Sequence, residues 1–387
     1  MAEVVIAGIG QTPVGEHWET SLRELAFQAL EAARQDSGGL RPEVIYVGNM
    51  LAPILSRQAQ LGALVGDFAG LHGVEASTIE AGGASGAAAF RMGYMAVASG
   101  QAEVALVVGV EKSTEQHSAA VEAAYATNLD TEYEVDQGMT PTSLAALLTR
   151  RYLYESGAPL SGLAGFPITA HANARTNPNA MFRAAINEEA YLKAGILSDP
   201  LNLFDVAPSA DGAAAAVLTR ADLLPPNFPH PLVRITGSAT ASDTLSLHDR
   251  GDMLDFRAAR LSVEQACRQA GILPRDVDFF ELYDAYSVYA ALSLEAAGFA
   301  GRGQGWQMAA QGVLGLGGEL PISTFGGLKA RGNPGGATGL YQVVEAALQL
   351  RGQAGSNEVS GAQTGMVQSL GGAASIAVTH ILTRYKP

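Results

Sequence analysis

The sequence predicts a mixed α/β fold that is built from two copies of one layered unit and carries an inserted loop domain. Three observations predict this class. Apolar runs typical of buried strands alternate with amphipathic helical patterns, the same elements recur in the same order in both halves, and one long stretch fits neither copy. Buried strands of a mixed α/β unit read as continuous apolar runs of this kind.

The first copy opens with a strand at residues 4–7. Ser21 and Glu24 then have the spacing of a capping box, which predicts a helix that starts beside them and ends at the glycines 38–39. The apolar run 44–47 predicts the next strand. The predicted core-facing side of the helix consists of Leu22, Leu25, Ala26, Ala29, Leu30 and Ala33.

The second copy repeats this order. Residues 232–235 form an apolar run, a helical pattern covers 257–270 and ends at Gly271, and a leader at 273–277 precedes Phe279 and Phe280. Like residues 40–44 of the first copy, the leader starts with Leu, ends with Val and contains a proline between them. Because matched elements keep the same order, we interpret the chain as an internal duplication.

Two further pairs extend the match. The glycine-rich segments 82–86 and 335–339 each open a small-residue helix, and apolar strands are predicted at 214–218 and 375–382. The glycines allow two interpretations. They let two buried helices pack closely, or their free backbone N–H groups stabilise an oxyanion, and the sequence leaves both open.

We expect the first half to comprise residues 1–112 and 200–224, and the second half 230–387. Residues 113–199 are rich in Asn, Thr, Glu and aromatic side chains, lack a long apolar run, and are predicted to form a loop domain that caps the site. A proline-rich connector at 225–229 joins the halves.

Composition excludes several classes of protein. Of 387 residues, 48% are hydrophobic and 16% charged, which excludes a disordered chain. The net charge of −14 without a basic cluster argues against nucleic acid or an anionic membrane as partner. The single cysteine, Cys267, rules out a disulfide framework and a thiolate metal site within the chain, and we expect it to pack in the core. With no apolar run long enough for a membrane helix, a cytoplasmic protein is expected.

Several motifs carry a resemblance to a known family. The segment 78–86 reads TIEAGGASG, 281–286 reads ELYDAY, 326–334 reads GGLKARGNP, and 368–372 reads QSLGG. On these and further markers the chain resembles the thiolase superfamily, most of all its sterol-carrier-protein and archaeal branch of acetyl-CoA acetyltransferases. The resemblance implies two αβαβα-layered halves with a loop domain. It also implies a homodimer, which we expect to bury the sheet edge near residues 104–108.

The departures from the family pattern concern its chemistry. Thiolases acylate one cysteine, deprotonate it with a histidine, and use a second cysteine to move a proton of acetyl-CoA. Here Gly83 stands at the acylated position and Asn333 at the histidine of G-H-P. Tyr283 and Ala285 replace the histidine and cysteine of H-D-C-F, and Ser369 stands where many members have their second cysteine. A covalent acyl-enzyme is therefore not expected.

Other catalytic features of the family are retained in the sequence. The resemblance implies an oxyanion hole from backbone N–H groups and side-chain donors that polarise a thioester carbonyl. Tyr283 and Tyr286 allow two interpretations, since either one can serve as general base once activated, or the two form a half-buried aromatic pair. Steroid side-chain aldolases, which are thiolase relatives without the cysteines, have a similar tyrosine-aspartate motif but differ at the G-N-P loop. The catalytic candidates are Gly83, Tyr283, Asn333, Tyr286 and Gly371, and the candidates for binding substrate or CoA are Ser85, Asp284 and Ser369.

The predicted function is that of an acyl-CoA-binding protein of lipid metabolism. We expect it to cleave or form a carbon–carbon bond without acylation, in a retro-aldol reaction through a CoA-thioester enolate. By similarity the chain would be named an acetyl-CoA acetyltransferase, but conventional thiolase activity is not expected. The alternative is a non-catalytic acyl-CoA-binding or scaffold subunit. No cofactor besides the acyl-CoA substrate is expected, and a small zinc-ribbon and OB-fold protein is a possible partner.

Overall fold

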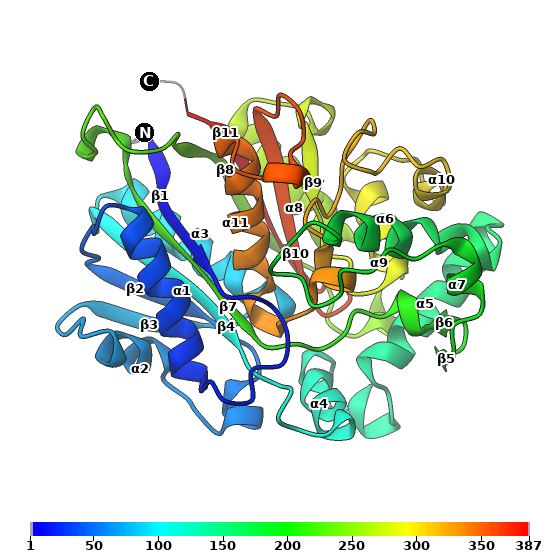
Figure 1. Ribbon diagram of the computed structural model, residues 1–387. Helices are drawn as coiled ribbons and strands as arrows, with labels where there is room; N and C mark the ends of the chain where they lie inside the picture. Colours follow the sequence, from blue (N-terminus) through cyan, green and yellow to red (C-terminus); the bar gives the residue numbers. More distant parts are fainter. Residues whose placement is uncertain (1–2, 386–387) are drawn as a thin grey trace.

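The computed structural model describes residues 3–385, and its centre is a nine-stranded sheet in the order β3-β2-β4-β7-β1-β8-β11-β10-β9 (Figure 1). The strands of the first half are β1 (Val4–Gln11), β2 (Val44–Gly48), β3 (Glu75–Ile79), β4 (Val104–Glu111) and β7 (Gly212–Arg220). Those of the second half are β8 (Val233–Ser242), β9 (Phe279–Glu281), β10 (Thr364–Gly371) and β11 (Ile376–Arg384).

The two halves of the sheet repeat one pattern. In the first half β2 pairs in parallel with β3 and β4, and β7 pairs antiparallel with β4 and β1. In the second half β9 pairs in parallel with β10, and β11 pairs antiparallel with β10 and β8. A parallel bridge between Phe280 and Ile322 stands at the place that β3 has in the first half. The predicted duplication is therefore confirmed, and β1 and β8 join the copies.

Helices make the remaining layers. Helix α1 (Leu22–Asp36) packs on β1 and β7, and α8 (Arg257–Ala270) packs on β8 and β11. Helices α3 (Ser85–Ser99) and α11 (Thr338–Arg351) contact each other and strands of both halves. The helix layers α1, α3 with α11, and α8 alternate with the two halves of the sheet, which gives the expected five layers. The predicted capping box of α1 is present, since Ser21 accepts from the Glu24 N–H and Glu24 accepts from the Ser21 N–H.

Glycines let the two central helices touch. A Cβ added to Gly339 on α11 would lie 2.4 Å from the backbone nitrogen of Ala87 on α3. A Cβ added to Gly86 would lie 2.9 Å from the carbonyl oxygen of Gly336. Neither distance leaves room for a side chain, so the close packing of the two glycine-rich segments is confirmed.

The chain between β4 and β7 forms a separate group of helices and two short strands over one end of the sheet (Figure 1). Their bounds are α4 (Ser118–Tyr125), α5 (Pro141–Ser156), α6 (Gly165–Ala174), α7 (Glu188–Leu192), β5 (Ile196–Ser198) and β6 (Leu201–Asn202). The remaining helices are α2 (Leu61–Phe68), α9 (Ser287–Ala296) and α10 (Gly305–Ala310).

One expectation about the sheet is wrong. Residues 104–108 belong to β4, which pairs with β2 on one side and β7 on the other and therefore offers no free edge. The apolar run of these residues predicts that the strand is buried. It does not tell whether the strand lies inside the sheet or at an edge that a second copy covers, because both places favour apolar residues. The free edge on this side of the sheet is β3.

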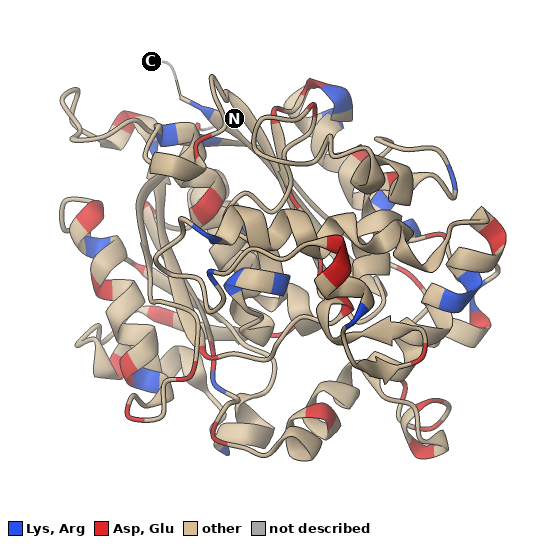
Figure 2. Ribbon diagram, turned by 45° about the vertical axis from the view of Figure 1, so that its right-hand side comes forward, with Lys and Arg blue, Asp and Glu red and all other residues tan. Residues whose placement is uncertain are grey.

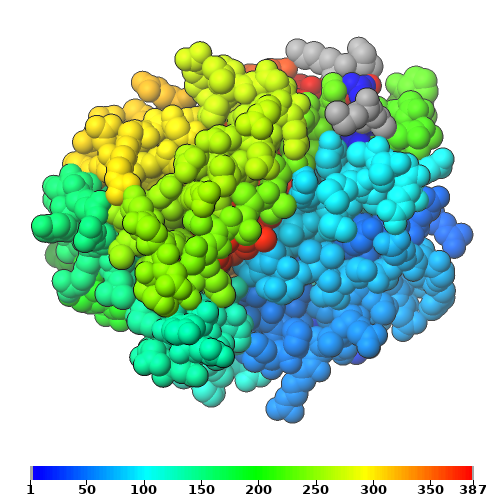
Figure 3. All heavy atoms as spheres, turned by 180° about the vertical axis from the view of Figure 1, so that it is seen from behind, coloured from blue at the N-terminus to red at the C-terminus, as the bar shows by residue number. Residues whose placement is uncertain are grey.

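The surface carries both signs of charge. Figure 2 shows Lys and Arg interspersed with Asp and Glu over many elements. Seen from behind, the C-terminal part of the chain is visible in a hollow between the N-terminal half and the segment that follows β8 (Figure 3). Among residues 3–385, no helix is long and apolar enough to span a membrane.

Candidate functional site

A pocket lies where several strands and helices end. It encloses about 730 Å³, open mouth included. Segments from both halves and from the 113–199 insertion meet there. The residues that line it are Met50, Gly83, Glu122, Tyr125, Asn128, Leu129, Pro141, Thr142, Val206, Ala207, Ser209, Tyr283, Ala285, Tyr286, Tyr289, Asn333, Gly372 and Ala373.

Gly83 and Tyr283 share one small volume in this pocket. Gly83 lies in the short turn of helix before α3, and Tyr283 follows the end of β9. A Cβ on Gly83 would lie 2.1 Å from the Tyr283 hydroxyl oxygen and 2.7 Å from the ring carbon that bears it. The phenol therefore occupies the space into which a side chain at position 83 would extend.

The Tyr283 hydroxyl is free to act on a ligand. Its ring is buried, with 6% exposure, and its hydroxyl makes no hydrogen bond with any other residue in the described range 3–385. Burial, and to a lesser degree the Asp284 carboxylate, raise the pKa of Tyr283 well above that of a free tyrosine. At neutral pH this side chain is a hydrogen-bond donor and not a base.

Asn333 presents its amide nitrogen to the pocket because its other polar groups are held. The Thr338 hydroxyl donates to the Asn333 Oδ1 at 3.1 Å, which assigns the amide orientation. The Asn333 N–H donates to the Pro208 carbonyl at 2.9 Å, and its own carbonyl accepts from Ala210 at 3.1 Å. With the oxygen occupied, the amide N–H groups remain for a ligand.

Tyr286 and Tyr289 form an aromatic wall. Their rings meet edge to face with centroids 4.9 Å apart, and the Tyr286 hydroxyl lies 3.3 Å from the hydroxyl of Thr142 on α5. Burial raises the pKa of both phenols and that of Tyr125, which lines the same pocket. None of the lining tyrosines is therefore ionised near pH 7.

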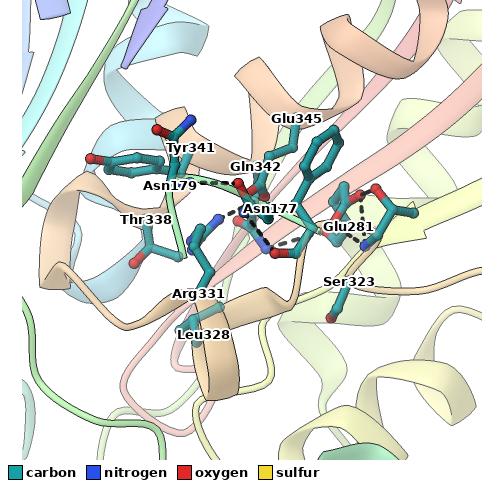
Figure 4. Close-up of polar contacts among 12 residues, drawn as sticks. Asn177, Asn179, Glu281, Ser323, Leu328, Arg331, Thr338, Tyr341, Gln342 and Glu345 are labelled. Atoms are coloured by element: carbon teal, nitrogen blue, oxygen red, sulfur yellow. Dashed lines mark hydrogen bonds and ion pairs between the residues drawn. The ribbon is translucent and has the colours of Figure 1, made fainter. Parts of the chain in front are cut away.

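A buried polar network anchors the loop that carries Asn333 (Figure 4). Arg331 donates to Glu345 on α11 at 2.7 Å, and both side chains are buried. Glu281 at the end of β9 accepts from the N–H and hydroxyl of Thr324. Burial and then the nearby Glu345 raise the pKa of Glu281 to about 8. These contacts bind the segment 324–331 to the core on both sides, so the position of Asn333 is fixed by the fold.

Two sequence families match the two halves of the chain. Residues 4–222 match the description "Thiolase, N-terminal domain", and residues 239–384 match "Thiolase C-terminal domain-like". The chain belongs to the thiolase family.

Two curated relatives of this thiolase-family chain have names that denote different reactions. An acetyl-CoA acetyltransferase of Methanothermobacter thermautotrophicus is 38% identical over 386 residues and covers 99% of this chain and 100% of its own length. A 17-hydroxy-3-oxo-4-pregnene-20-carboxyl-CoA lyase of Mycobacterium tuberculosis is 28% identical over 381 residues, with 93% of this chain and 94% of the relative covered.

Two solved structures are similar over the whole chain. The Ltp2-ChsH2(DUF35) aldolase has a TM-score of 0.85 at 25% identity and covers 99% of this chain and 98% of its own. The acetyl-CoA acetyltransferase of Syntrophomonas wolfei has a TM-score of 0.75 at 17% identity and covers both chains fully, which shows the shared fold.

In this thiolase-family chain, the structure brings Gly83, Tyr283, Tyr286 and Asn333 into one pocket. Gly371 lies just outside it, as the last residue of β10. The next residue lines the pocket instead and has the left-handed φ of 55° that favours glycine. Of the two glycines at the end of β10, Gly372 is therefore the one that lines the pocket.

The three residues that were candidates for binding CoA lie outside the pocket lining. Ser85 donates to the Gly82 carbonyl at 2.6 Å and so closes the turn that holds Gly83. Asp284 accepts from the Leu328 N–H at 2.7 Å, and Ser369 donates to Gln342 in the core. Ser85 and Asp284 thus hold backbone groups around the site and Ser369 holds the Gln342 side chain, and their role in binding CoA stays a prediction.

Sequence reasoning missed the contribution of the insertion. Glu122, Tyr125 and Asn128 come from α4 and the turn after it, and Thr142 comes from the start of α5. No motif marked these residues, because their place in the pocket depends on how the insertion folds back over the sheet. The cluster of Glu and aromatic residues within 113–199 was the one available signal.

The site contains neither a thiol nor an imidazole among its lining residues. Cys267, the only cysteine of the chain, is buried within α8, as expected. Burial and the nearby Asp276 raise the pKa of its thiol to about 11. Within residues 3–385, no group of three His, Cys, Asp or Glu side chains is placed to hold a metal ion.

Proposed function

We propose that this chain binds an acyl-CoA thioester and cleaves or forms a carbon–carbon bond through the thioester enolate, without a covalent acyl-enzyme. The observation that carries the proposal is the contact between Gly83 and Tyr283. A nucleophilic side chain has no room at position 83, and a hydrogen-bond donor occupies that room instead. The site thus has the means to stabilise an oxyanion but no side chain at position 83 to be acylated.

The pocket's donors suit this chemistry. The Tyr283 hydroxyl, the Asn333 amide and the backbone N–H of Gly83 all belong to residues that line the pocket. In a retro-aldol reaction the bond between Cα and Cβ breaks and its electron pair moves onto the thioester, which becomes an enolate. Preorganised donors around that oxygen lower the barrier because they bind the developing charge more tightly than the neutral carbonyl.

The relatives support this choice of reaction. The similar solved structure with the higher TM-score is named an aldolase and contains a DUF35 partner, and the curated steroid relative is named a carboxyl-CoA lyase. The archaeal relatives, by contrast, are named acetyl-CoA acetyltransferases. Their names support a CoA thioester as substrate class here. We further propose that a small DUF35-like protein pairs with this chain.

A second function is favoured by one observation. All four tyrosines that line the pocket have a raised pKa, so none provides a tyrosinate base. A pocket whose tyrosines all remain protonated donors suits a subunit that binds acyl-CoA and leaves catalysis to a partner.

One experiment separates the two functions. The purified chain is incubated with 3-hydroxybutyryl-CoA, with bulkier β-hydroxyacyl-CoAs and with acetoacetyl-CoA plus CoA, and products are followed by mass spectrometry. Retro-aldol catalysis gives a free acyl-CoA and an aldehyde or ketone from the β-hydroxy substrates, without thiolysis of acetoacetyl-CoA. Binding of acyl-CoA without turnover, whether or not a DUF35-like protein is added, would establish the non-catalytic role.

A further inference from the structure

The charge of the pocket is concentrated in one side chain. Of the described residues that line it, Glu122 alone carries a formal charge. The rest are apolar or aromatic residues, glycines, hydroxyls and amides. Hydroxyl and amide groups do not accept a proton near neutral pH, so Glu122 is the one lining group with the chemistry of a base.

The local fold holds Glu122 at the pocket. It lies on α4, and the Thr142 N–H at the start of α5 donates to its Oε1 at 3.3 Å. That is the one hydrogen bond Glu122 makes within residues 3–385, so most of its lone pairs are free for a ligand. Thr142 also contacts Tyr286 through its hydroxyl, at 3.3 Å. The carboxylate is thereby tied to the aromatic wall that borders Tyr283.

We propose that Glu122 is the general base of the carbon–carbon cleavage, a role that rests on the proposed function. The Glu122 carboxylate takes the proton of the substrate's β-hydroxyl, and that oxygen forms a carbonyl as the Cα–Cβ bond breaks. The electron pair of the bond moves to the thioester, whose enolate oxygen is held by Tyr283 and Asn333. The proton on Glu122 then returns to Cα, which restores the carboxylate and the neutral acyl-CoA.

Glu122 contributes to the raised pKa of one of the four tyrosines, Tyr286. The negative charge of Glu122 is one of the influences that keep the Tyr286 phenol protonated, after burial. The Glu122 carboxylate accepts the proton of the substrate's β-hydroxyl, whereas the protonated phenols donate hydrogen bonds to the enolate. The base therefore comes from the insertion and the donors come from the two duplicated halves.

The test uses the full chain, with its DUF35-like partner if activity requires one, and the best β-hydroxyacyl-CoA of the panel above. Glu122→Gln keeps the shape and should lower kcat by 10²- to 10⁴-fold, the usual contribution of a general base. Glu132→Gln, an exposed glutamate of the same insertion outside the pocket, is the matched control and should keep full activity. Calorimetry with CoA should give the same Kd for all three proteins, which shows that each is folded.

Chemical rescue distinguishes a base from a structural residue. Formate added to Glu122→Ala should restore part of the lost rate, because a small carboxylate can enter the space left by the side chain. Glu122→Asp should retain intermediate activity. An active wild type whose Glu122→Gln variant keeps more than a tenth of its kcat overturns the role of Glu122 alone. A wild type that binds CoA and turns over no β-hydroxyacyl-CoA overturns the proposed function, and this inference with it.

Discussion

The hydroxyl oxygen of Tyr283 lies 2.1 Å from the point at which a side chain on Gly83 would begin. Because Gly83 does not have a positive φ, the restriction at this position is one of space and not of backbone conformation. Two residues from different halves of the chain thus determine together that the pocket has a donor where a nucleophile would stand.

Gly83→Cys should not produce a working thiolase. The new thiol competes with the Tyr283 phenol for space, and Asn333 cannot take its proton as a histidine would. We expect at most a trapped acyl adduct by mass spectrometry, without conversion of acetoacetyl-CoA and CoA to acetyl-CoA. Steady thiolysis at an ordinary thiolase rate would show that a base remains near position 83.

Gly83→Ala should lower the free energy of unfolding. Its Cβ forces the Tyr283 ring or the Leu370 carbonyl, 2.8 Å away, to move, and overpacking of this kind costs about 1–3 kcal/mol. Gly251→Ala is the matched control, because its Cβ meets nothing within 4 Å. Urea denaturation of both variants measures the difference, and equal midpoints would contradict the close contact.

Asn333→Ala should lower kcat/KM by about 10²- to 10³-fold, the usual loss for one oxyanion donor, if the proposed reaction is right. Thr338→Val should lower it less, because it frees the amide to rotate without removing it, and Thr338→Ser should restore the rate. Steady-state kinetics on the best substrate checks the order of the three variants.

Stability should fall with rising pH on account of Glu281. Burial raises the pKa of this group from 4.5 to about 8, so folding favours its protonated form. Its contribution is complete below the unfolded pKa and is lost as the pH rises through about 8. Urea denaturation between pH 5 and pH 8 should show this decrease for the wild type and a smaller one for Glu281→Gln.

Alkylation should leave the protein's function unchanged. Cys267 is 3% exposed, and burial raises the pKa of its thiol to about 11, so little reactive thiolate exists at neutral pH. Iodoacetamide at doses that inactivate cysteine-dependent thiolases should alter neither CoA binding nor turnover. Inactivation that Cys267→Ser prevents would place a functional thiol in this chain.

The chain should form a homodimer through β3. This strand is the free edge of the sheet next to β2, and an unpaired edge strand favours pairing with a second copy. Light scattering at micromolar concentration should give twice the mass of the chain. A monomer under these conditions would leave the edge uncovered and contradict the prediction.

The sequence by itself determined the repeated α/β architecture. The helix after Ser21, the helix at 257–270 and the paired glycine segments follow from local rules of capping, periodicity and helix contact, which act over a few residues. The family motifs also indicated Gly83, Tyr283 and Asn333, because each stands inside a local pattern. The exact limits of the loop domain remain a prediction.

Only the tertiary structure decided how these residues meet. The contact of Gly83 with Tyr283, the entry of Glu122 into the pocket and the interior place of β4 all depend on which strands pair and where their ends converge. Local patterns carry no information about such distant pairs. Ser85, Asp284 and Ser369 follow the same rule, since their neighbours in space decide which group each polar side chain meets.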